Sequence, residues 1–342
     1  MALAEAPRIA LVKLSSLGDV VHALPLAATL RAARPAAHLT WVVERREAAI
    51  LREHPALDDV VVADTRRWRR ARSAGALGAT VREMYRLQRR LAAARFDVAI
   101  DAQGLIKSGV LVAATRAPVR VGFARAVVRE PLGSLFTTER VTPPRTASHV
   151  VDQCLALLDA LGISERRHEF RLPSAPTAEA FAEEWLASVG IKPRHRLVVL
   201  NPGAGRADKR WPVAHFATLA RHLVHDAGAH VVITWGPGEE DLARGIASAE
   251  PASGPGVVVA PPTDLDTLLA LLRRASVLVA ADTGPLHLAA ALDTACVGLF
   301  GPTSARRNGP YGSRHRTLSS DDGTMVSLVP SVVLPIVLEL LG

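Results

Sequence analysis

Short runs of β-branched and apolar residues alternate with alanine- and leucine-rich stretches along the whole chain. In the first half, apolar strands are predicted at 8–14, 38–44, 60–64, 96–103 and 119–123. In the second half, they are predicted at 196–203, 230–236, 257–260, 277–284 and 296–302, with helical patterns between them. Strands that are apolar throughout and alternate with helices are typical of parallel sheets covered on both faces. The sequence therefore predicts an α/β protein built from doubly wound parallel sheets.

The length of 342 residues is enough for about two such domains. The segment 171–180 contains two prolines and several small residues, which is typical of a linker. We therefore expect an N-terminal domain over 1–170 and a C-terminal domain over 181–324, with ligands bound in a cleft between them. The tail 325–342 is apolar but contains two prolines, so we expect a helix that packs back on the body and does not span a membrane.

Positive charge is concentrated in one part of the chain. Residues 1–170 hold 26 basic and 17 acidic side chains, whereas residues 171–342 hold 15 and 16, so the first half accounts for the net charge of +8. The stretch 66–95 alone contains ten arginines and a single acid, Glu83. Basic proteins often bind nucleic acid, but aromatic residues make up only 4% of this chain and leave few stacking platforms for bases. We expect a local anionic partner and no nucleic acid.

Several protein classes are excluded by what the sequence lacks. The only two cysteines, Cys154 and Cys296, are far apart, which excludes a disulfide scaffold and a cysteine-based zinc site. The start of the chain is predicted to be a strand and a loop, not a signal peptide. The motifs GxxxxGK(S/T), GxSxG and a complete GxGxxG are absent, so a P-loop NTPase, an α/β-hydrolase and a nicotinamide dehydrogenase are disfavoured.

Four predicted strand-to-helix turns are polar and contain glycine. Free N–H groups at a helix start bind anions, and three of these turns lie in the neutral second half. A nucleotide diphosphate held there by backbone dipoles would need few cations, for which Lys209 and Arg210 are candidates. The alternative is that the glycines only allow the turns to form. The four turns are 15–19, 201–211, 235–240 and 281–287.

Two of these turns carry acidic residues with two possible roles. Asp19 follows the first strand, where a carboxylate can accept a proton from a hydroxyl, but it can equally cap the helix that begins beside it. Asp282 and Thr283 open a later helix and leave the same two interpretations. His287, about one and a half turns into that helix, is either a site residue or a structural histidine.

The arginine-rich stretch has two parts. In the first, four arginines surround Trp68 in a segment before a helix, where they could bind a phosphate or carboxylate bidentately or simply be solvated. The second part is helical from about Thr80, with one apolar face and one arginine face that is expected to be solvated. The apolar face is Val81, Met84, Gln88 and Leu91, and the arginine face is Arg82, Arg86, Arg89 and Arg90.

Taken together, the motifs resemble those of the ADP-heptose glycosyltransferases, glycosyltransferase family 9. The resemblance covers nearly the whole chain, and its segments TRRWRR, DAQGLIKS and REPL are similar to the type I branch of the family. The similar segments are 12–25, 65–70, 96–108, 129–136, 208–212, 235–240, 281–292 and 301–303. The resemblance implies the GT-B fold, two Rossmann-like doubly wound domains facing a cleft.

The resemblance also implies a reaction. Members of the type I branch transfer L-glycero-D-manno-heptose from ADP-heptose to the Kdo of Kdo–lipid A, with inversion and with neither a metal nor a cofactor. It implies a cytoplasmic enzyme that is peripherally associated with the inner membrane. A type II or III heptosyltransferase, or a transferase of another ADP-sugar, is the alternative within the family, and the oligomeric state is left open.

Roles carry over residue by residue from this resemblance. Asp19 matches the catalytic base, Lys209 matches the catalytic and donor-phosphate lysine, and Glu240 matches the acid at the donor ribose. The family loop before Lys209 often offers hydroxyl groups to the phosphates, whereas this chain has glycine and alanine, so backbone N–H groups would have to serve. The implied donor-binding residues are Ser15, Gly18, Ala204, Gly205, Lys209, Glu240, Asp282, Thr283, Gly284 and His287. The implied acceptor-binding residues are Arg66, Arg67, Arg69, Arg70, Lys107 and Arg129.

Overall fold

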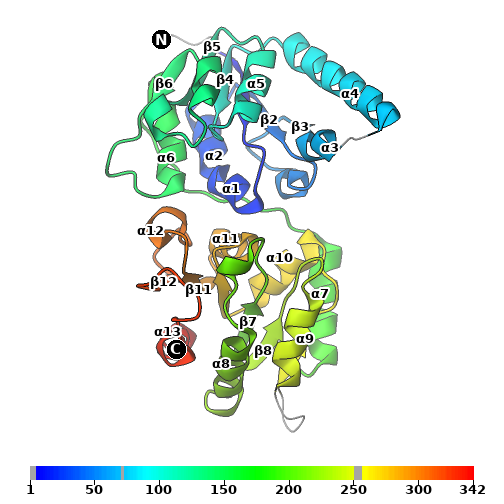
Figure 1. The fold of residues 1–342 in the computed structure, drawn as a ribbon, viewed down its shortest axis with the longest axis vertical. Helices are drawn as coiled ribbons and strands as arrows, with labels where there is room; N and C mark the ends of the chain where they lie inside the picture. Colours follow the sequence, from blue (N-terminus) through cyan, green and yellow to red (C-terminus); the bar gives the residue numbers. More distant parts are fainter. Residues whose placement is uncertain (1–4, 71–72, 250–255) are drawn as a thin grey trace. The chain divides into compact units, whose positions relative to one another are not determined.

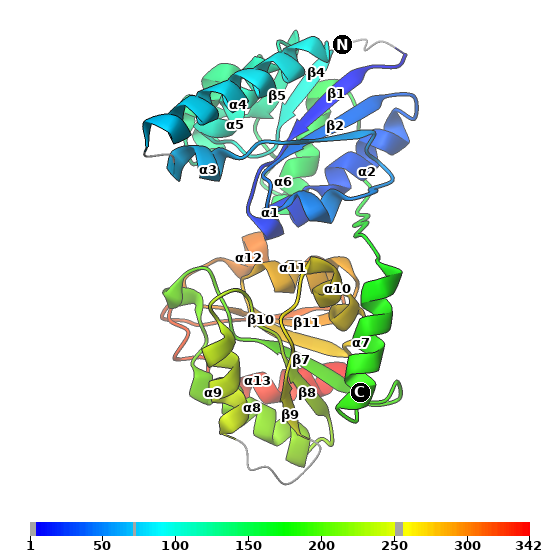
Figure 2. The same ribbon diagram turned by 90° about the vertical axis from the view of Figure 1, so that its right-hand side faces the viewer.

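A computed structural model describes residues 5–70, 73–249 and 256–342 (Figures 1 and 2). The chain divides into two compact units, Met1–Arg171 and Leu172–Gly342. Each unit contains one six-stranded sheet in which every strand pairing is parallel. These two sheets and their helices confirm the predicted doubly wound α/β fold.

The N-terminal sheet has the strand order β3-β2-β1-β4-β5-β6. Its strands are Arg8–Val12 (β1), His38–Val43 (β2), Asp59–Val62 (β3), Val98–Asp101 (β4), Val119–Phe123 (β5) and Glu139–Val141 (β6). The direction of winding reverses between β1 and β4, which are hydrogen-bonded neighbours. In open α/β sheets, ligands bind beyond the carboxyl ends of the strands at such a switch point.

Helices cover both faces of this sheet, with α4 and α5 on one face and α2 and α6 on the other (Figure 2). The helices are Leu17–His22 (α1), Leu24–Ala33 (α2), Thr65–Arg70 (α3), Ala74–Ala93 (α4), Ile106–Ala114 (α5) and Val150–Ala156 (α6). Short 3-10 helices lie at Ala48–Leu51 (η1), Arg125–Val127 (η2), Pro131–Phe136 (η3) and Leu157–Leu161 (η4). The single helix predicted after β1 is two helices, because Pro25 lies in the first turn of α2, where a missing N–H is tolerated.

The C-terminal sheet repeats the same winding. Its order is β12-β11-β10-β7-β8-β9, so the switch point lies between β7 and β10. Its strands are Leu197–Asn201 (β7), His230–Ile233 (β8), Val257–Val259 (β9), Val277–Ala281 (β10), Ala295–Phe300 (β11) and Arg316–Ser319 (β12). Its helices are Pro176–Ser188 (α7), Ala207–Lys209 (η5), Val213–His225 (α8), Glu240–Ser248 (α9), Leu265–Arg274 (α10), Gly284–Ala291 (α11), Ala305–Asn308 (α12) and Pro330–Leu341 (α13).

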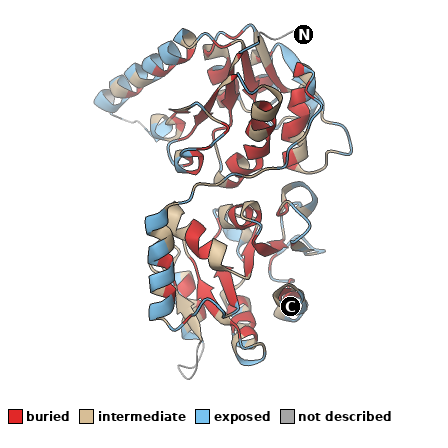
Figure 3. Cartoon of the chain, turned by 180° about the vertical axis from the view of Figure 1, so that it is seen from behind, coloured by how far each residue is buried: buried red, intermediate tan, exposed pale blue. Residues whose placement is uncertain are grey.

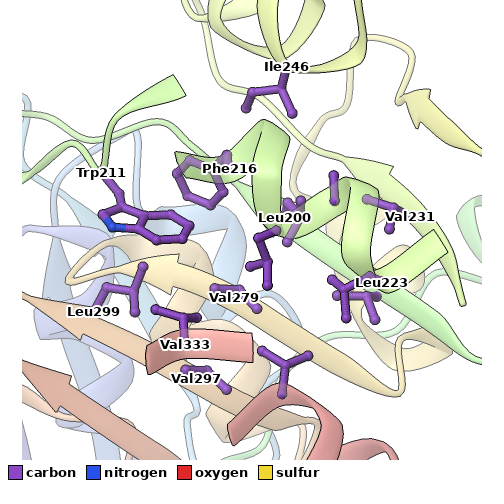
Figure 4. Close-up of a cluster of buried hydrophobic side chains, with 14 of the residues drawn as sticks. Leu200, Trp211, Phe216, Leu223, Val231, Ile246, Val279, Val297, Leu299 and Val333 are labelled. Carbon is purple, nitrogen blue, oxygen red and sulfur yellow. The ribbon is translucent and has the colours of Figure 1, made fainter. Parts of the chain in front are cut away.

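The core of the C-terminal unit lies between the sheet and helices α8, α9 and α13 (Figure 4). Trp211 and Phe216 pack edge to face, with ring centroids 4.7 Å apart. The indole of Trp211 also donates a hydrogen bond of 2.6 Å to the carbonyl of Leu328, which anchors the start of the tail. Val333 and Val337 of α13 are fully buried in this core, and each such side chain contributes about 1.5–3 kcal/mol. The tail residues therefore form an integral helix of this unit.

Two edge strands were not predicted from the sequence, and the expected linker 171–180 is partly helical. β6 and β12 are short and half-exposed, so they lack the continuous apolar run by which the other strands were predicted. Helix α7 begins at Pro176, so it occupies the second half of the segment expected to link the domains. In the part of the chain that the structure describes, no helix has both the length and the apolar character needed to cross a membrane.

Candidate active site

The loop after β1 holds Asp19 at the third position of α1. One carboxylate oxygen, Oδ2, accepts hydrogen bonds from the backbone N–H and the hydroxyl of Ser16, both at 2.8 Å. This reciprocal capping box fixes the start of the helix. The side chain of Asp19 is nevertheless 38% exposed, so a substrate hydroxyl can approach it. The capping geometry is therefore present and is compatible with proton transfer at the same carboxylate.

Lys13, at the end of β1, is a buried cation beside Asp19. Its Nζ lies 3.7 Å from Oδ1 of Asp19 and donates a hydrogen bond of 2.9 Å to the carbonyl of Ala102 after β4. The sequence pattern did not single out Lys13 as a site residue. The available signal was a lone lysine near the end of an apolar strand, a position where a charge is costly unless it is paired.

The loop after β4 supports the loop after β1. The side-chain oxygen of Gln103 accepts hydrogen bonds from the backbone N–H groups of Leu14 and Ser15, at 2.9 and 3.2 Å. Burial raises the pKa of Asp101, whose carboxylate accepts bonds from the N–H of Gln103 and the hydroxyl of Ser108. Asp101 and Gln103 thus shape the DAQGLIKS segment and hold the two loops together at the switch point.

Lys107, in the first turn of α5, projects toward the Asp19 loop. Its Nζ lies 3.4 Å from the hydroxyl of Ser15 and 3.7 Å from Oε1 of Glu44. Glu44 is fully buried at the end of β2 and also accepts a hydrogen bond from Thr65. The structure therefore brings together Ser15 and Lys107, one predicted on the donor side and one on the acceptor side. Gly18 lies buried within α1, one residue before Asp19.

The arginines around Trp68 lie before the longer helix α4, as predicted, and form a short helix of their own, α3. The chain can turn into a helix here because it contains neither glycine nor proline. Arg66 donates a hydrogen bond of 2.8 Å to the buried Glu47, and Arg67 pairs with Glu83 on α4. The remaining two, Arg69 and Arg70, are exposed, as is Arg129 after η2. Arg66 and Arg67 are thus held in ion pairs, although the side chain of Arg67 is 55% exposed, while Arg69 and Arg70 are exposed.

In the C-terminal unit, the loops after β7 and β10 meet in a triad of charged groups. Lys209 donates a hydrogen bond of 2.8 Å to Oδ2 of Asp282, and the Nε2 of His287 lies 3.2 Å from Oδ1. Burial acts to raise the pKa of Asp282, but the hydrogen bonds from His287 and Lys209 outweigh it and hold the pKa well below its usual range. The carboxylate stays ionised and fixes the lysine at the switch point.

The triad lies at the start of α11. Thr283 is its N-cap residue, but its hydroxyl donates to the carbonyl of Ala281 and does not cap the helix. Gly284 and Pro285 form the first turn, in which backbone N–H groups lack partners within the helix. A helix start beside a fixed lysine can bind an anion such as a diphosphate.

The loop after β7 is closed by Glu239, a residue that the sequence analysis did not single out. The carboxylate of Glu239 accepts a hydrogen bond of 3.0 Å from the N–H of Gly236 and lies against Gly203, where any Cβ would overlap it. Glycine is therefore required at 203 for this close approach. Glu240 instead pairs with Arg244 on the exposed side of α9, at 2.6 Å.

The other two predicted residues of this loop differ in exposure. Ala204 is buried, and its carbonyl accepts hydrogen bonds from the guanidinium of Arg210, at 3.2 and 3.3 Å. Gly205 is exposed. The loop therefore offers backbone groups and no hydroxyl. Within the described ranges, no three histidine, cysteine, aspartate or glutamate side chains are grouped so as to hold a metal ion.

Comparison with known proteins places this geometry in a family. The model of glycosyltransferase family 9 (heptosyltransferase) matches residues 84–332. The chain is 31% identical over 328 residues to lipopolysaccharide heptosyltransferase 1 of Escherichia coli strain K12, an alignment that covers 96% of this chain and 98% of that protein.

Two solved structures extend the comparison. They are E. coli heptosyltransferase WaaC with ADP, at a TM-score of 0.80, and the same enzyme with ADP-2-deoxy-2-fluoro heptose, at 0.76. Both are 31% identical to this chain and cover 97% of it, with 99% of the solved chain matched. The chain belongs to glycosyltransferase family 9, the heptosyltransferases, and is a glycosyltransferase, which confirms the resemblance found in its motifs.

Proposed function

We propose that this family 9 transferase moves L-glycero-D-manno-heptose from ADP-heptose to the Kdo of Kdo–lipid A, in the synthesis of the lipopolysaccharide inner core. The similar E. coli enzyme is named lipopolysaccharide heptosyltransferase 1 and has been solved with ADP and with an ADP-heptose analogue. The observation that carries the proposal is the pair of switch-point loops, one with an exposed carboxylate and one with a fixed lysine at a helix start.

Asp19 acts as the general base in this proposal. The acceptor hydroxyl attacks the anomeric carbon of the heptose, its proton passes to Asp19, and the bond from that carbon to the diphosphate breaks with its electron pair leaving on ADP. Attack on the face opposite the leaving group inverts the anomeric configuration. The hydrogen bonds from Ser16 support the role because they fix the carboxylate without burying it.

The C-terminal unit binds the donor. Lys209 and the N–H groups at the start of α11 stabilise the charge that develops on the departing diphosphate. Asp282 and His287 hold Lys209 in place, while Thr283 and Gly284 line the same turn. Because ADP is a good leaving group and these groups offset its charge, the proposed reaction needs neither a metal nor a cofactor.

The exposed cations of the N-terminal unit bind the acceptor. Kdo carries a carboxylate and lipid A carries phosphates, both of which guanidinium groups bind bidentately. Arg69, Arg70 and Arg129 are exposed and can reach such groups, and Lys107 lies beside Ser15 in the Asp19 loop. An enzyme acting on a lipid-anchored sugar would work in the cytoplasm, at the face of the inner membrane.

The decisive experiment offers ADP-heptose and separate acceptors to the purified protein and measures the mass of the products. Addition of one heptose to Kdo–lipid A supports the proposal. Addition only to an acceptor that already carries heptose would instead support a type II or III activity, and transfer from another ADP-sugar would change the donor. Absence of transfer to every acceptor, with ADP still bound, would contradict the proposed reaction.

A further inference from the structure

Exposed apolar side chains gather on one side of the N-terminal unit. Among the described residues, fourteen large apolar side chains are exposed, and nine of them belong to α4, α5, η2 and η3. They are Leu77, Val81, Met84, Tyr85, Ile106, Val110, Val127, Leu132 and Leu135, each at least 40% exposed. Surface apolar residues are ordinary when scattered, but a gathered set marks an interaction surface.

These four elements are packed side by side. Leu87 and Leu91 of α4 are buried in the core of the unit, beside Leu111 and Val112 of α5. Helix α5 approaches η3 so closely that a Cβ at Gly109 would overlap the ring of Phe136, and η2 contacts η3 in turn. We call this continuous region the α4–α5–η3 face.

Helix α4 has three distinct sides. Of the α4 residues whose burial the structure describes, only Thr80, Leu87 and Leu91 are buried, so most of the helix is exposed (Figure 3). The sequence had placed Val81, Met84 and Leu91 on one apolar face, but the structure buries only Leu91 of these.

At about 100° per residue, the four exposed apolar residues of α4 fall within an arc of about 100°. They are Leu77, Val81, Met84 and Tyr85. Arg82, Arg86 and Arg89 follow beside that arc and are also exposed. The guanidinium of Arg89 lies 5.9 Å from the ring centroid of Tyr85, at the border between the two sides.

The charge of this face is positive because basic residues outnumber acids on it, as on α4, where Arg82, Arg86, Arg89 and Arg90 accompany one acid. The acids that the structure describes on these four elements and the turn between η2 and η3 are Glu83 and Glu130. Glu83 pairs with Arg67 and accepts from the indole of Trp68, and Glu130 accepts a hydrogen bond of 2.8 Å from the N–H of Ile106. Exposed arginines therefore border the apolar residues without exposed, unpaired acids among them.

We propose that the α4–α5–η3 face docks on an anionic lipid bilayer, with its apolar side chains entering the headgroup region and its arginines binding lipid phosphates. An exposed apolar stripe bordered by arginines is typical of helices that lie in a membrane interface, and each cation near an anionic leaflet strengthens such binding. The inference rests on the proposed function, because a lipid-anchored acceptor requires an enzyme that works at a bilayer surface. The inference goes beyond that function by naming the helices that contact the bilayer.

Co-sedimentation of the full chain with vesicles tests the proposal. We expect the wild type to bind phosphatidylglycerol vesicles at least tenfold more strongly than phosphatidylcholine vesicles. The triple variant Val81→Ser, Met84→Ser, Tyr85→Ser should lose at least tenfold in binding to phosphatidylglycerol. Replacing Arg82, Arg86 and Arg89 with Gln should reduce the preference for the anionic lipid.

The matched control removes the same number of exposed apolar side chains from the C-terminal unit, namely Phe181→Ser, Val332→Ser and Leu338→Ser. This control should bind vesicles like the wild type, and all variants should keep the wild-type unfolding midpoint. Wild-type binding by the α4 serine variant, or equal loss in the control, would overturn the proposal. So would a dimer that the serine substitutions dissociate, because a second copy would then cover the face.

The vesicles contain no acceptor, so this result is independent of heptose transfer. If the transferase activity is absent but the serine variant still loses vesicle binding, the docking surface stands and the proposed function fails. If the protein transfers heptose but the serine variant binds vesicles like the wild type, the proposed function stands and the docking surface fails. With a deacylated, soluble Kdo acceptor, the serine variant should keep the wild-type kcat, and its KM should rise only for acceptor embedded in vesicles.

Discussion

The two units wind their sheets in the same order and place a carboxylate in the loop at each switch point, but the two carboxylates differ in their surroundings. Asp19 is 38% exposed and uses Oδ2 to cap α1, while its Oδ1 lies 3.7 Å from Lys13. Asp282 is 8% exposed, and its two oxygens are engaged separately by Lys209 and His287. The two strands that flank the switch point, the first of one sheet and the fourth of the other, thus lead to one accessible carboxylate and one that is locked in an ion pair.

In the proposed reaction, this difference assigns the two carboxylates different tasks. A base must be reachable and must have an oxygen available for an incoming proton. A carboxylate that fixes a cation must instead stay ionised and keep its geometry while the ligand changes charge. Exposure and partners, not the position after a strand, distinguish the two roles.

The largest effect is expected at the accessible carboxylate. Asp19→Asn keeps an oxygen that can accept the bonds from Ser16 but removes the basic group, so kcat should fall about 10³-fold. Binding of ADP, measured by calorimetry, should remain within about twofold of the wild-type value, because Lys209 and the start of α11, the proposed diphosphate-binding groups, lie in the other unit. A turnover close to wild type in this variant would exclude Asp19 as the base.

Ser16→Ala is the matched control for that variant. It retains the carboxylate and removes the hydrogen bond from the Ser16 hydroxyl, so kcat should fall by less than about tenfold. A loss as large as that of Asp19→Asn would show that orientation of the loop, not the base itself, dominates the effect.

Asp282, the carboxylate locked in an ion pair, should contribute more to stability than Asp19. Asp282→Asn leaves Lys209 and His287 without their ionised partner in a largely buried site. We expect the free energy of unfolding to fall by about 2–3 kcal/mol, below the range for a fully buried pair because Lys209 is partly exposed. Denaturant unfolding measures this loss. Glu240→Gln, which removes an exposed carboxylate paired with Arg244, should change stability by less than about 0.5 kcal/mol.

A comparison of the wild type with Asp282→Asn also predicts how stability depends on pH. The folded state holds the pKa of Asp282 below the ordinary 3.8, so its contribution to stability is fully present above that value and is lost as the pH falls toward the folded pKa. Below about pH 4, the unfolding free energy of the wild type should therefore decrease more steeply than that of Asp282→Asn. Parallel curves in that window would contradict the ion-pair role.

The sequence predicted the strands and loops well because their signals are local. Every apolar strand that it predicted has a counterpart, and the turn 281–287 was recognised from its own residues. The partners of a residue in the folded chain are not local, so the contacts made by Lys13, Gln103 and Glu239 were not predicted. Edge strands such as β6 were missed because one exposed side removes the apolar run.

A moderate effect is expected for Lys13, the cation beside the proposed base Asp19. Lys13→Met keeps the length of the buried side chain but removes the charge near Asp19 and the hydrogen bond to Ala102. We expect kcat to fall about tenfold, equivalent to about 1.4 kcal/mol, while the KM for ADP-heptose changes by less than twofold. Steady-state kinetics separates the two parameters. A loss of stability with unchanged kcat would assign Lys13 a purely structural role.

The smallest effect concerns the arginines of α3, where the contrast between engaged and accessible charges recurs within one helix. Replacing the exposed Arg69 and Arg70 with Gln should raise the KM for the anionic acceptor about three- to fivefold, a typical loss for exposed charge pairs, and leave stability unchanged. Arg66→Gln should instead lower stability by about 1 kcal/mol, because the buried Glu47 then lacks its ionic partner. Acceptor titrations and unfolding curves of both variants measure these two outcomes. If Arg66→Gln raises the acceptor KM as much as the double variant does, the division of this cluster is wrong, and Glu47 holds an arginine that the acceptor can recruit.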